Sequence, residues 1–177
     1  CAFVNGQGQW GDMPCLPSAL GITARCLCAG PANASAAFPD DLDALEAVVA
    51  ALRREGVDVW VQVGDIVGYG PQPSECIDFV RELGCVTCMG NHDAAVLGRL
   101  DTAYFNSVAR TAIHWTAPQL RPSDREFLSS LAFVEQRDVY TVVHGTLHMP
   151  EKFGYVLSVV EALESFEHQQ TPLCFVG

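Results

Sequence analysis

The chain has 177 residues and a mass of 19.1 kDa, which is about the size of one domain. Hydrophobic residues make up 49% and charged residues 18% of it, a composition that is typical of globular proteins and excludes a disordered or collagen-like chain. The formal net charge is −11, so the chain would repel a phosphate backbone at long range, and we expect no nonspecific binding to nucleic acid.

Residues 1–39 differ in character from the rest of the chain. They carry only two charged side chains, Asp12 and Arg25, and show no sustained period of 2 or 3.6 residues. The first residue is Cys1 rather than Met, so we expect a processed chain or a fragment. We interpret residues 1–39 as an atypical segment that need not be native to the domain, and the break in composition favours a reading-frame or assembly error upstream.

The first regular sequence pattern begins at Asp40 and predicts a helix. Asp40 or Asp41 is placed to cap this helix, and Gly56 is placed to end it. Its apolar residues recur at helical spacing. They are Leu42, Leu45, Val49 and Leu52.

The next three sequence patterns predict a strand, a helix and a second strand. Residues 57–63 alternate with a period of two and are rich in β-branched side chains, as in a strand. A helix over about 74–83 is ended by Gly84, and residues 85–89 form a short apolar strand. This order within so few residues implies a right-handed parallel crossover.

Further along, residues 123–126 and 158–161 have the pattern of capping boxes, each opening a short helix. Residues 139–143 read as a buried strand and residues 172–176 as a last strand. The predicted fold class is therefore α/β, with helices covering a largely parallel or mixed sheet.

Polar side chains follow three of the predicted strands. The segment 64–71 follows the first strand, the tight polar turn 90–93 follows the second, and His144 with Gly145 follows the third. Reactive groups in such folds gather just beyond the carboxyl ends of strands, so we expect these segments to converge.

The side chains in these segments are candidate metal ligands. Asp65 supplies a carboxylate that can bridge two cations, Asn91 a carbonyl oxygen and His144 a neutral imidazole, a set that suits Mn, Fe, Zn or Mg. His92 would lie beside the ions without being a ligand, and its protonated ring could donate to a departing alkoxide. Taken alone, the loop after Asp65 could be a simple turn and His144 a buried structural histidine.

The order of these motifs resembles that of the calcineurin-like metallophosphoesterases, in particular the small bacterial and archaeal phosphodiesterase type. Residues 64–70 match G-D-x-x-x-x-G, residues 90–93 match G-N-H-D/E, and His144 with Gly145 matches a histidine often followed by glycine. The similarity covers about residues 40–177, which we interpret as a partial domain of this family.

The resemblance implies an α/β sandwich and a two-metal hydrolase of phosphomonoesters or phosphodiesters with a small phosphoester substrate. Asp65 would bridge two divalent ions (Mn, Fe, Zn, Ni or Mg), and Asn91 and His144 would bind the second ion. His92 would protonate the leaving group, and Asp93 would orient His92.

Two departures from the family pattern lead us to expect an incomplete sandwich. Ala37 and Pro39 occupy the places of Asp and His in the D-x-H motif that belongs before the first helix, and the chain stops at Gly177 where the family continues with His-x-His. With these ligands missing, we expect weak metal binding and little turnover. The alternative is a noncatalytic, degenerate or fragmentary member with at most a binding role.

The eight cysteines admit several interpretations. Cys85 and Cys88 form a lone C-x-x-C without a second pair at zinc-site spacing, and buried thiols are favoured over a redox pair. A cysteine-based metal module in residues 1–39 is a third possibility for the function. The start of the chain lacks the basic and apolar regions of a signal peptide, and no apolar run is long enough to cross a bilayer, so we expect reduced thiols, a cytoplasmic location and no membrane association.

Overall fold

The computed structural model describes the backbone of two short strands in the first part of the chain and most of the remainder, namely residues 2–4, 10–12, 41–54 and 59–177. The chain divides into two compact units, Cys1–Ala37 and Phe38–Gly177. In the first unit β1 (Ala2–Val4) pairs with β2 (Trp10–Asp12) in antiparallel fashion. The cysteines of this unit, and the Ala37 and Pro39 positions, lie outside the described residues.

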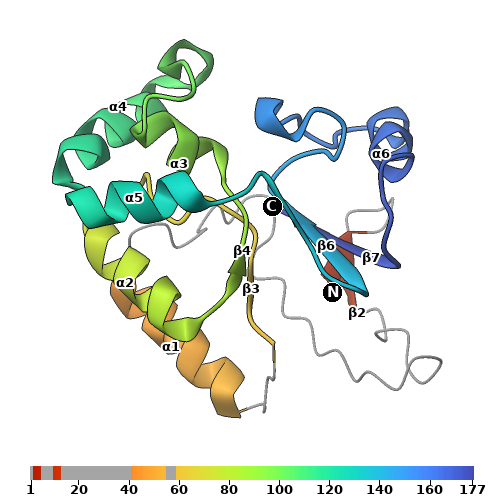
Figure 1. Cartoon of the computed structure of the whole chain (residues 1–177), viewed down its shortest axis with the longest axis horizontal. Coiled ribbons are helices and arrows are strands. Elements are labelled where there is room, and N and C mark those ends of the chain that lie inside the picture. The colour runs from red at the N-terminus through yellow and green to blue at the C-terminus, as the bar shows by residue number, and fades with distance from the viewer. Residues whose placement is uncertain (1, 5–9, 13–40, 55–58) are drawn as a thin grey trace. The chain divides into compact units, whose positions relative to one another are not determined.

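The second unit contains both helices and strands (Figure 1). Its helices are α1 (Leu42–Arg54), α2 (Pro73–Leu83), α3 (Asn91–Val96), α4 (Ser107–Thr116), α5 (Pro122–Ser130) and α6 (Val159–Phe166). Short 3-10 turns lie at Thr102–Tyr104, Ala117–Gln119 and Pro150–Lys152. Its strands are β3 (Val61–Gln62), β4 (Val86–Thr87), β5 (Val134–Gln136), β6 (Tyr140–Val143) and β7 (Leu173–Val176).

The strands of this unit pair mainly in parallel. β3 pairs with β4 across the helix α2, and β6 pairs with β7 across the helix α6, both in parallel. β5 is antiparallel to β6 and completes the order β5-β6-β7. The predicted α/β class and the predicted parallel pairing around α2 are therefore confirmed.

The predicted helix ends agree closely with the structure. Asp41 caps α1, because its carboxylate accepts the N–H of Ala44 at 3.0 Å. The helix α2 ends at Gly84, which has the left-handed φ of 67° that favours glycine. Asp40 and Gly56 lie outside the described residues.

Two local predictions are wrong in detail. Residues 90–93 do not form an isolated turn: Gly90 is the N-cap of α3, and Asp93 at the third helical position caps it. The helix α5 begins two residues earlier than its apparent capping box predicts, with Arg121 rather than Ser123 as the N-cap and Asp124 as the capping carboxylate. In both cases the carboxylate that caps the helix also bonds groups far away in sequence, which a local pattern does not show.

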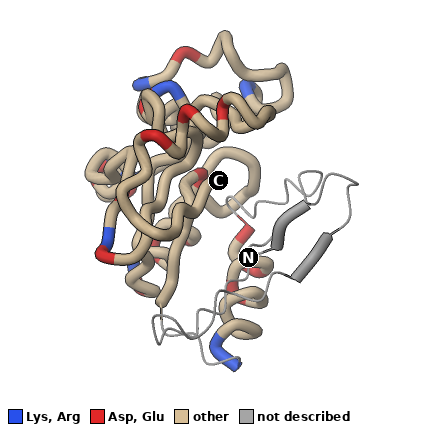
Figure 2. Tube along the Cα trace, turned by 90° about the vertical axis from the view of Figure 1, so that its right-hand side faces the viewer, with Lys and Arg blue, Asp and Glu red and all other residues tan. Residues whose placement is uncertain are grey.

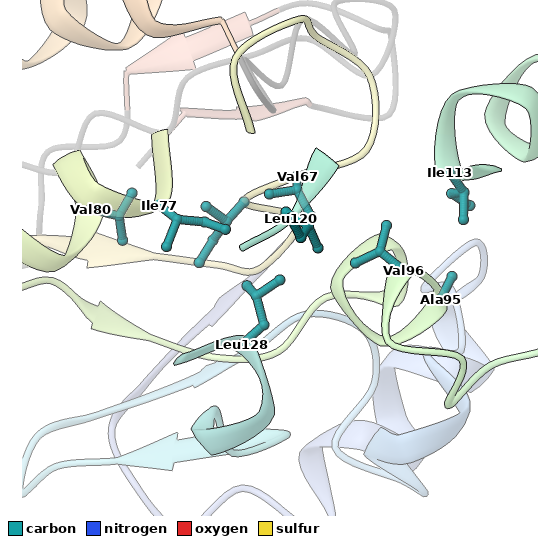
Figure 3. Close-up of a cluster of buried hydrophobic side chains, with 9 residues drawn as sticks. Val67, Ile77, Val80, Ala95, Val96, Ile113, Leu120 and Leu128 are labelled. Atoms are coloured by element: carbon teal, nitrogen blue, oxygen red, sulfur yellow. The ribbon is translucent and has the colours of Figure 1, made fainter. Parts of the chain in front are cut away.

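The hydrophobic core lies among the helices and the loop that follows β3 (Figure 3). Figure 1 shows α1, α2, α3 and α5 on one side of the β3–β4 pair. The buried cluster consists of Ile66, Val67, Ile77, Val80, Ala95, Val96, Ile113, Leu120 and Leu128. Ile66 directly follows Asp65, so the core anchors the loop that carries the first candidate ligand. None of the helices in the described part of the chain has the length and apolar character that a bilayer crossing requires.

Asp124 joins α5 to α2 through a buried polar network. Its carboxylate is fully buried and accepts hydrogen bonds from the guanidinium and backbone N–H of Arg121 and from the hydroxyl of Ser74 at 2.6 Å. Burial raises the pKa of Asp124, but the bonds from Arg121 and Ser74 outweigh it, and the pKa lies below its ordinary value.

We therefore expect Asp124→Ala to lower the free energy of unfolding by about 3 kcal/mol, because it leaves these donors without their charged acceptor. Urea denaturation followed by circular dichroism measures this loss. Asp138→Ala removes an exposed aspartate and is the matched control. A loss below about 1 kcal/mol for Asp124→Ala would show that the network contributes little.

Candidate functional site

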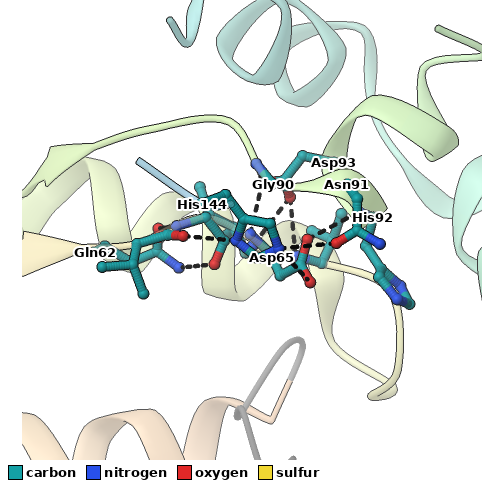
Figure 4. A network of polar contacts seen from close by, with 11 residues as sticks. Gln62, Asp65, Gly90, Asn91, His92, Asp93 and His144 are labelled. Atoms are coloured by element: carbon teal, nitrogen blue, oxygen red, sulfur yellow. Dashed lines mark hydrogen bonds and ion pairs between the residues drawn. The ribbon is translucent and has the colours of Figure 1, made fainter. Parts of the chain in front are cut away.

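The structure brings the three predicted ligands together (Figure 4). Asp65 follows β3, Asn91 is the first residue of α3 after β4, and His144 directly follows β6. The Nε2 atom of His144 lies 2.8 Å from Oδ1 of Asn91 and 3.4 Å from Oδ2 of Asp65. The three side chains thus lie together beyond the carboxyl ends of their strands, as we expected from the sequence.

His144 presents a lone pair to the other two side chains. Its Nδ1 lies 2.7 Å from the carbonyl oxygen of Val63, so Nδ1 carries the proton and donates it there. Burial lowers the pKa of His144, while the bond to Val63 and the charge of Asp93 oppose the decrease. The ring is therefore neutral near pH 7, with an unprotonated Nε2 facing Asn91 and Asp65.

The amide of Asn91 fits a cation in one orientation and the cation-free protein in the other. With Oδ1 toward His144, two acceptors face each other, a repulsion that a bound cation between them removes. When the amide is turned by 180°, its nitrogen donates to Nε2 of His144 at 2.8 Å and to Oδ2 of Asp65 at 3.1 Å. The chemistry of the set, one carboxylate, one amide oxygen and one imidazole, thus fits a divalent metal ion.

Asp65 has a backbone conformation that costs free energy. Its φ of 56° is in the left-handed region, which costs a non-glycine residue about 1–2 kcal/mol. The residue is held from two directions: its Oδ1 accepts the backbone N–H of His92 at 2.8 Å, and its own N–H donates to Oδ2 of Asp93 at 2.9 Å. These bonds tie the Asp65 loop to the first turn of α3.

Asp93 has a different role from the one expected for it. Its fully buried carboxylate accepts backbone N–H groups rather than orienting the ring of His92. The four donors are Asp65, Ile66, Val67 and Gly90, at 2.9 to 3.2 Å. Burial and the charge of Asp65 raise the pKa of Asp93, while the N–H groups of Gly90 and Val67 oppose the increase. We conclude that Asp93 holds the Asp65 loop against α3.

His92 lies beside the candidate ligands and is almost completely buried, with 4% of its surface exposed. Its ring is 4.4 Å from that of Tyr69 and 5.1 Å from that of Phe105, measured between centroids. Burial, and then the proximity of His144, lower the pKa of His92 to about 4, although the hydrogen bond that the ring donates to the backbone of Gly68 opposes the decrease. His92 is therefore neutral near pH 7.

Of the three candidate ligands, only Asp65 and His144 belong to the residue types His, Cys, Asp and Glu that most often bind metal ions. Among the described residues, no group of three or more His, Cys, Asp or Glu side chains is placed to hold a metal ion. Asn91 is the third member here. Gln62, which the sequence interpretation did not single out, also belongs to this region, because its side chain binds the backbone of Gly64.

The C-x-x-C pair consists of buried or half-buried thiols. Cys85 and Cys88 are both free, and Cys88 is fully buried. Burial raises the pKa of Cys85 to about 11 and that of Cys88 to about 12, so neither is a reactive thiolate at neutral pH. This environment favours the interpretation as structural thiols over a redox pair.

Comparisons with known proteins agree with the motifs. A sequence model described as calcineurin-like phosphoesterase matches residues 38–172. The crystal structure of a metallophosphoesterase from Sphaerobacter thermophilus is 43% identical, with a TM-score of 0.66 over 78% of this chain and 56% of that one. The uncharacterized protein MJ0912 of Methanocaldococcus jannaschii is 37% identical over 99 residues, which are 56% of this chain and 41% of that protein.

The chain thus spans less than two thirds of the length of either relative. The family match itself covers most of the chain and contains Asp65, Asn91, His92, Asp93 and His144. The helices and strands of the second unit have the mixed arrangement of the Sphaerobacter structure. The chain therefore belongs to the calcineurin-like phosphoesterase family.

Proposed function

We propose that the chain carries the site of a metal-dependent phosphoesterase that hydrolyses a small phosphomonoester or phosphodiester. The most direct support is geometric. Oδ1 of Asn91 and Oδ2 of Asp65 both lie within 3.4 Å of the Nε2 atom of His144. Membership of the calcineurin-like phosphoesterase family supports the reaction class.

In this proposal Asp65, Asn91 and His144 would hold the divalent ions of the site, with Asp65 serving both ions and Asn91 and His144 one of them. Two divalent ions supply Lewis acidity toward the phosphoryl oxygens and a hydroxide at neutral pH. The chain's own residues keep this site in place: Val63 fixes the tautomer of His144, and Asp93 fixes the loop that carries Asp65. The ions rather than Lys or Arg side chains would attract the phosphate, which reconciles the site with a net charge of −11.

We assign the proton donation to the leaving group to His92, which lies next to Asn91. Its pKa of about 4 makes the charged imidazole a stronger acid than an ordinary histidine but a scarce one at neutral pH. The three candidate ligands are also fewer than the four to six that divalent ions usually take from proteins and water. We therefore expect weak cation binding and slow turnover for this chain.

The test is hydrolysis of a chromogenic aryl phosphodiester by the full chain with and without Mn²⁺. We expect a slow rate that requires Mn²⁺ and decreases at least 100-fold in Asp65→Asn, because that change removes the one negative charge among the three candidate ligands. Calorimetric titration with Mn²⁺ should show the same loss of binding. Asp43→Asn changes an exposed aspartate on α1 and should leave both measurements unchanged.

A rate that neither chelation nor Asp65→Asn reduces would contradict the proposed chemistry. A chain that binds no Mn²⁺ and hydrolyses nothing would favour the noncatalytic alternative. Fast turnover of a phosphodiester with Mn²⁺ would confirm the reaction class but contradict the expected impairment.

We further propose that residues 40–177 form the phosphoesterase part of the chain, apart from residues 1–39, and that the protein acts in the cytoplasm. The thiols of Cys85, Cys88 and Cys174, in the described part of the chain, are free, as in a reducing compartment. Figure 2 shows Lys and Arg at separate points along the described trace, and the net charge of −11 supports the expectation of no nonspecific binding to nucleic acid.

A further inference from the structure

Gln62 lies in β3 beside the candidate ligands (Figure 4), and its side chain folds onto the backbone of Gly64. The Oε1 atom of Gln62 accepts the N–H of Gly64 at 2.7 Å, and its Nε2 donates to the C=O of Gly64 at 2.7 Å. One neutral carboxamide thus binds both peptide groups of Gly64. A glutamate or leucine at this position could not supply both the acceptor and the donor at neutral pH.

Gly64 is the point where the three segments of the site meet. It has a φ of 91°, and a Cβ atom on it would lie 2.8 Å from Cα of Gly90 and 2.8 Å from Nδ1 of His144. The backbone of Gly64 therefore lies close against two groups: Gly90, which precedes Asn91, and the ring of His144. Because Gly64 precedes Asp65, a rotation of its peptide groups would move the Asp65 carboxylate relative to both.

We infer that Gln62 is a positioning residue that holds Asp65 in register with Asn91 and His144 for cation binding. The inference rests on the proposed metal site and adds a residue to it. Asp93 restrains Asp65 on the side of α3, and Gln62 restrains the preceding peptide on the side of β3. The C=O of Gly64 and the N–H of Asp65 belong to one peptide group, so the two restraints bind that group from both sides and hold the left-handed residue after it within the narrow tolerance that a metal ligand requires.

The test compares Gln62→Leu and Gln62→Glu with a control, Gln136→Leu, which changes an exposed glutamine at the end of β5. In the metal-free full chain, we expect amide hydrogen exchange at Gly64 to accelerate at least tenfold in Gln62→Leu, with exchange in α2 unchanged. In calorimetric titrations, we expect the dissociation constant for Mn²⁺ to increase about tenfold in Gln62→Leu and to stay unchanged in the control.

Gln62→Glu distinguishes the effect of a lost hydrogen bond to Gly64 from the effect of an added charge. An added negative charge near the site would strengthen cation binding, whereas loss of the donor to the C=O of Gly64 would weaken it, so we expect weaker Mn²⁺ binding than in the wild type. Unchanged exchange at Gly64 in Gln62→Leu, or Mn²⁺ affinity within twofold of the wild type, would overturn the inference. A wild-type chain that binds no Mn²⁺ would overturn the proposed function together with the cation part of this inference.

Discussion

Replacing Asp93 with alanine should lower the free energy of unfolding by about 4 kcal/mol, a large part of the 5–15 kcal/mol that is typical of single domains. The carboxylate is fully buried and accepts four backbone N–H groups, three of them from the loop that follows β3. Alanine leaves all four donors without a partner inside the protein, at about 1–3 kcal/mol each before relaxation. Urea denaturation of the metal-free chain measures the loss.

Two further variants make this result specific. Asp101→Ala removes an exposed aspartate whose carboxylate accepts one N–H, from Ala103, and should cost about 1 kcal/mol or less. Asp93→Asn keeps one acceptor oxygen but turns an NH₂ group toward backbone donors, so its cost should lie close to that of alanine. If Asp93→Ala lost no more stability than Asp101→Ala, the four hydrogen bonds would not be holding the Asp65 loop.

The same substitution should also weaken cation binding, because Asp93 holds the N–H of Asp65. This separates Asp93 from Asp124, whose network joins α5 to α2 and includes none of the candidate ligands. Both carboxylates are completely buried and both cap a helix. Their different partners explain why one substitution should affect stability and cation binding together and the other stability alone.

The parts of the fold that local patterns control could be predicted from the sequence. Asp41 caps α1 by accepting the N–H of Ala44, which is three residues away. Gly84 ends α2 because its own backbone adopts the left-handed conformation that favours glycine. Asp65 and Asn91 could be placed at one site because they follow β3 and β4, which pair in parallel, while His144 follows β6 of the other sheet and could be placed there only by the order of the motifs.

The role of Asp93 could not be predicted because its partners are distant in sequence. The N–H groups of Asp65 and Val67 lie 28 and 26 residues away from it. The order of the motif instead suggested a contact with the neighbouring His92. Gln62 was missed for another reason: in a segment that alternates with a period of two, a polar side chain between Val61 and Val63 looks like an ordinary outward-facing residue.

In the metal-free protein, His92 should make the folded state sensitive to acid. Burial lowers its pKa to about 4 in the folded chain, compared with about 6.5 in an unfolded one. Below pH 6.5 the unfolded chain therefore binds a proton that the folded chain does not, so the stability from the neutral ring is complete above pH 6.5 and decreases as the pH falls toward 4. The decrease from this residue should be about 2–3 kcal/mol between pH 7 and pH 4.5.

His92→Phe isolates this contribution, because phenylalanine keeps a ring between Tyr69 and Phe105 but binds no proton. Urea denaturation of both proteins in a chelator at pH 7 and pH 4.5 should show that the variant loses about 2–3 kcal/mol less than the wild type over this range. Comparing the two proteins cancels the titrating groups that do not interact with His92, while the effect of His144 on His92 is part of the measured difference. His114→Phe changes an exposed histidine on α4 and should follow the wild type. Parallel pH dependences of the wild type and His92→Phe would mean that the fold does not hold His92 neutral, and the assigned acid would then be available at neutral pH.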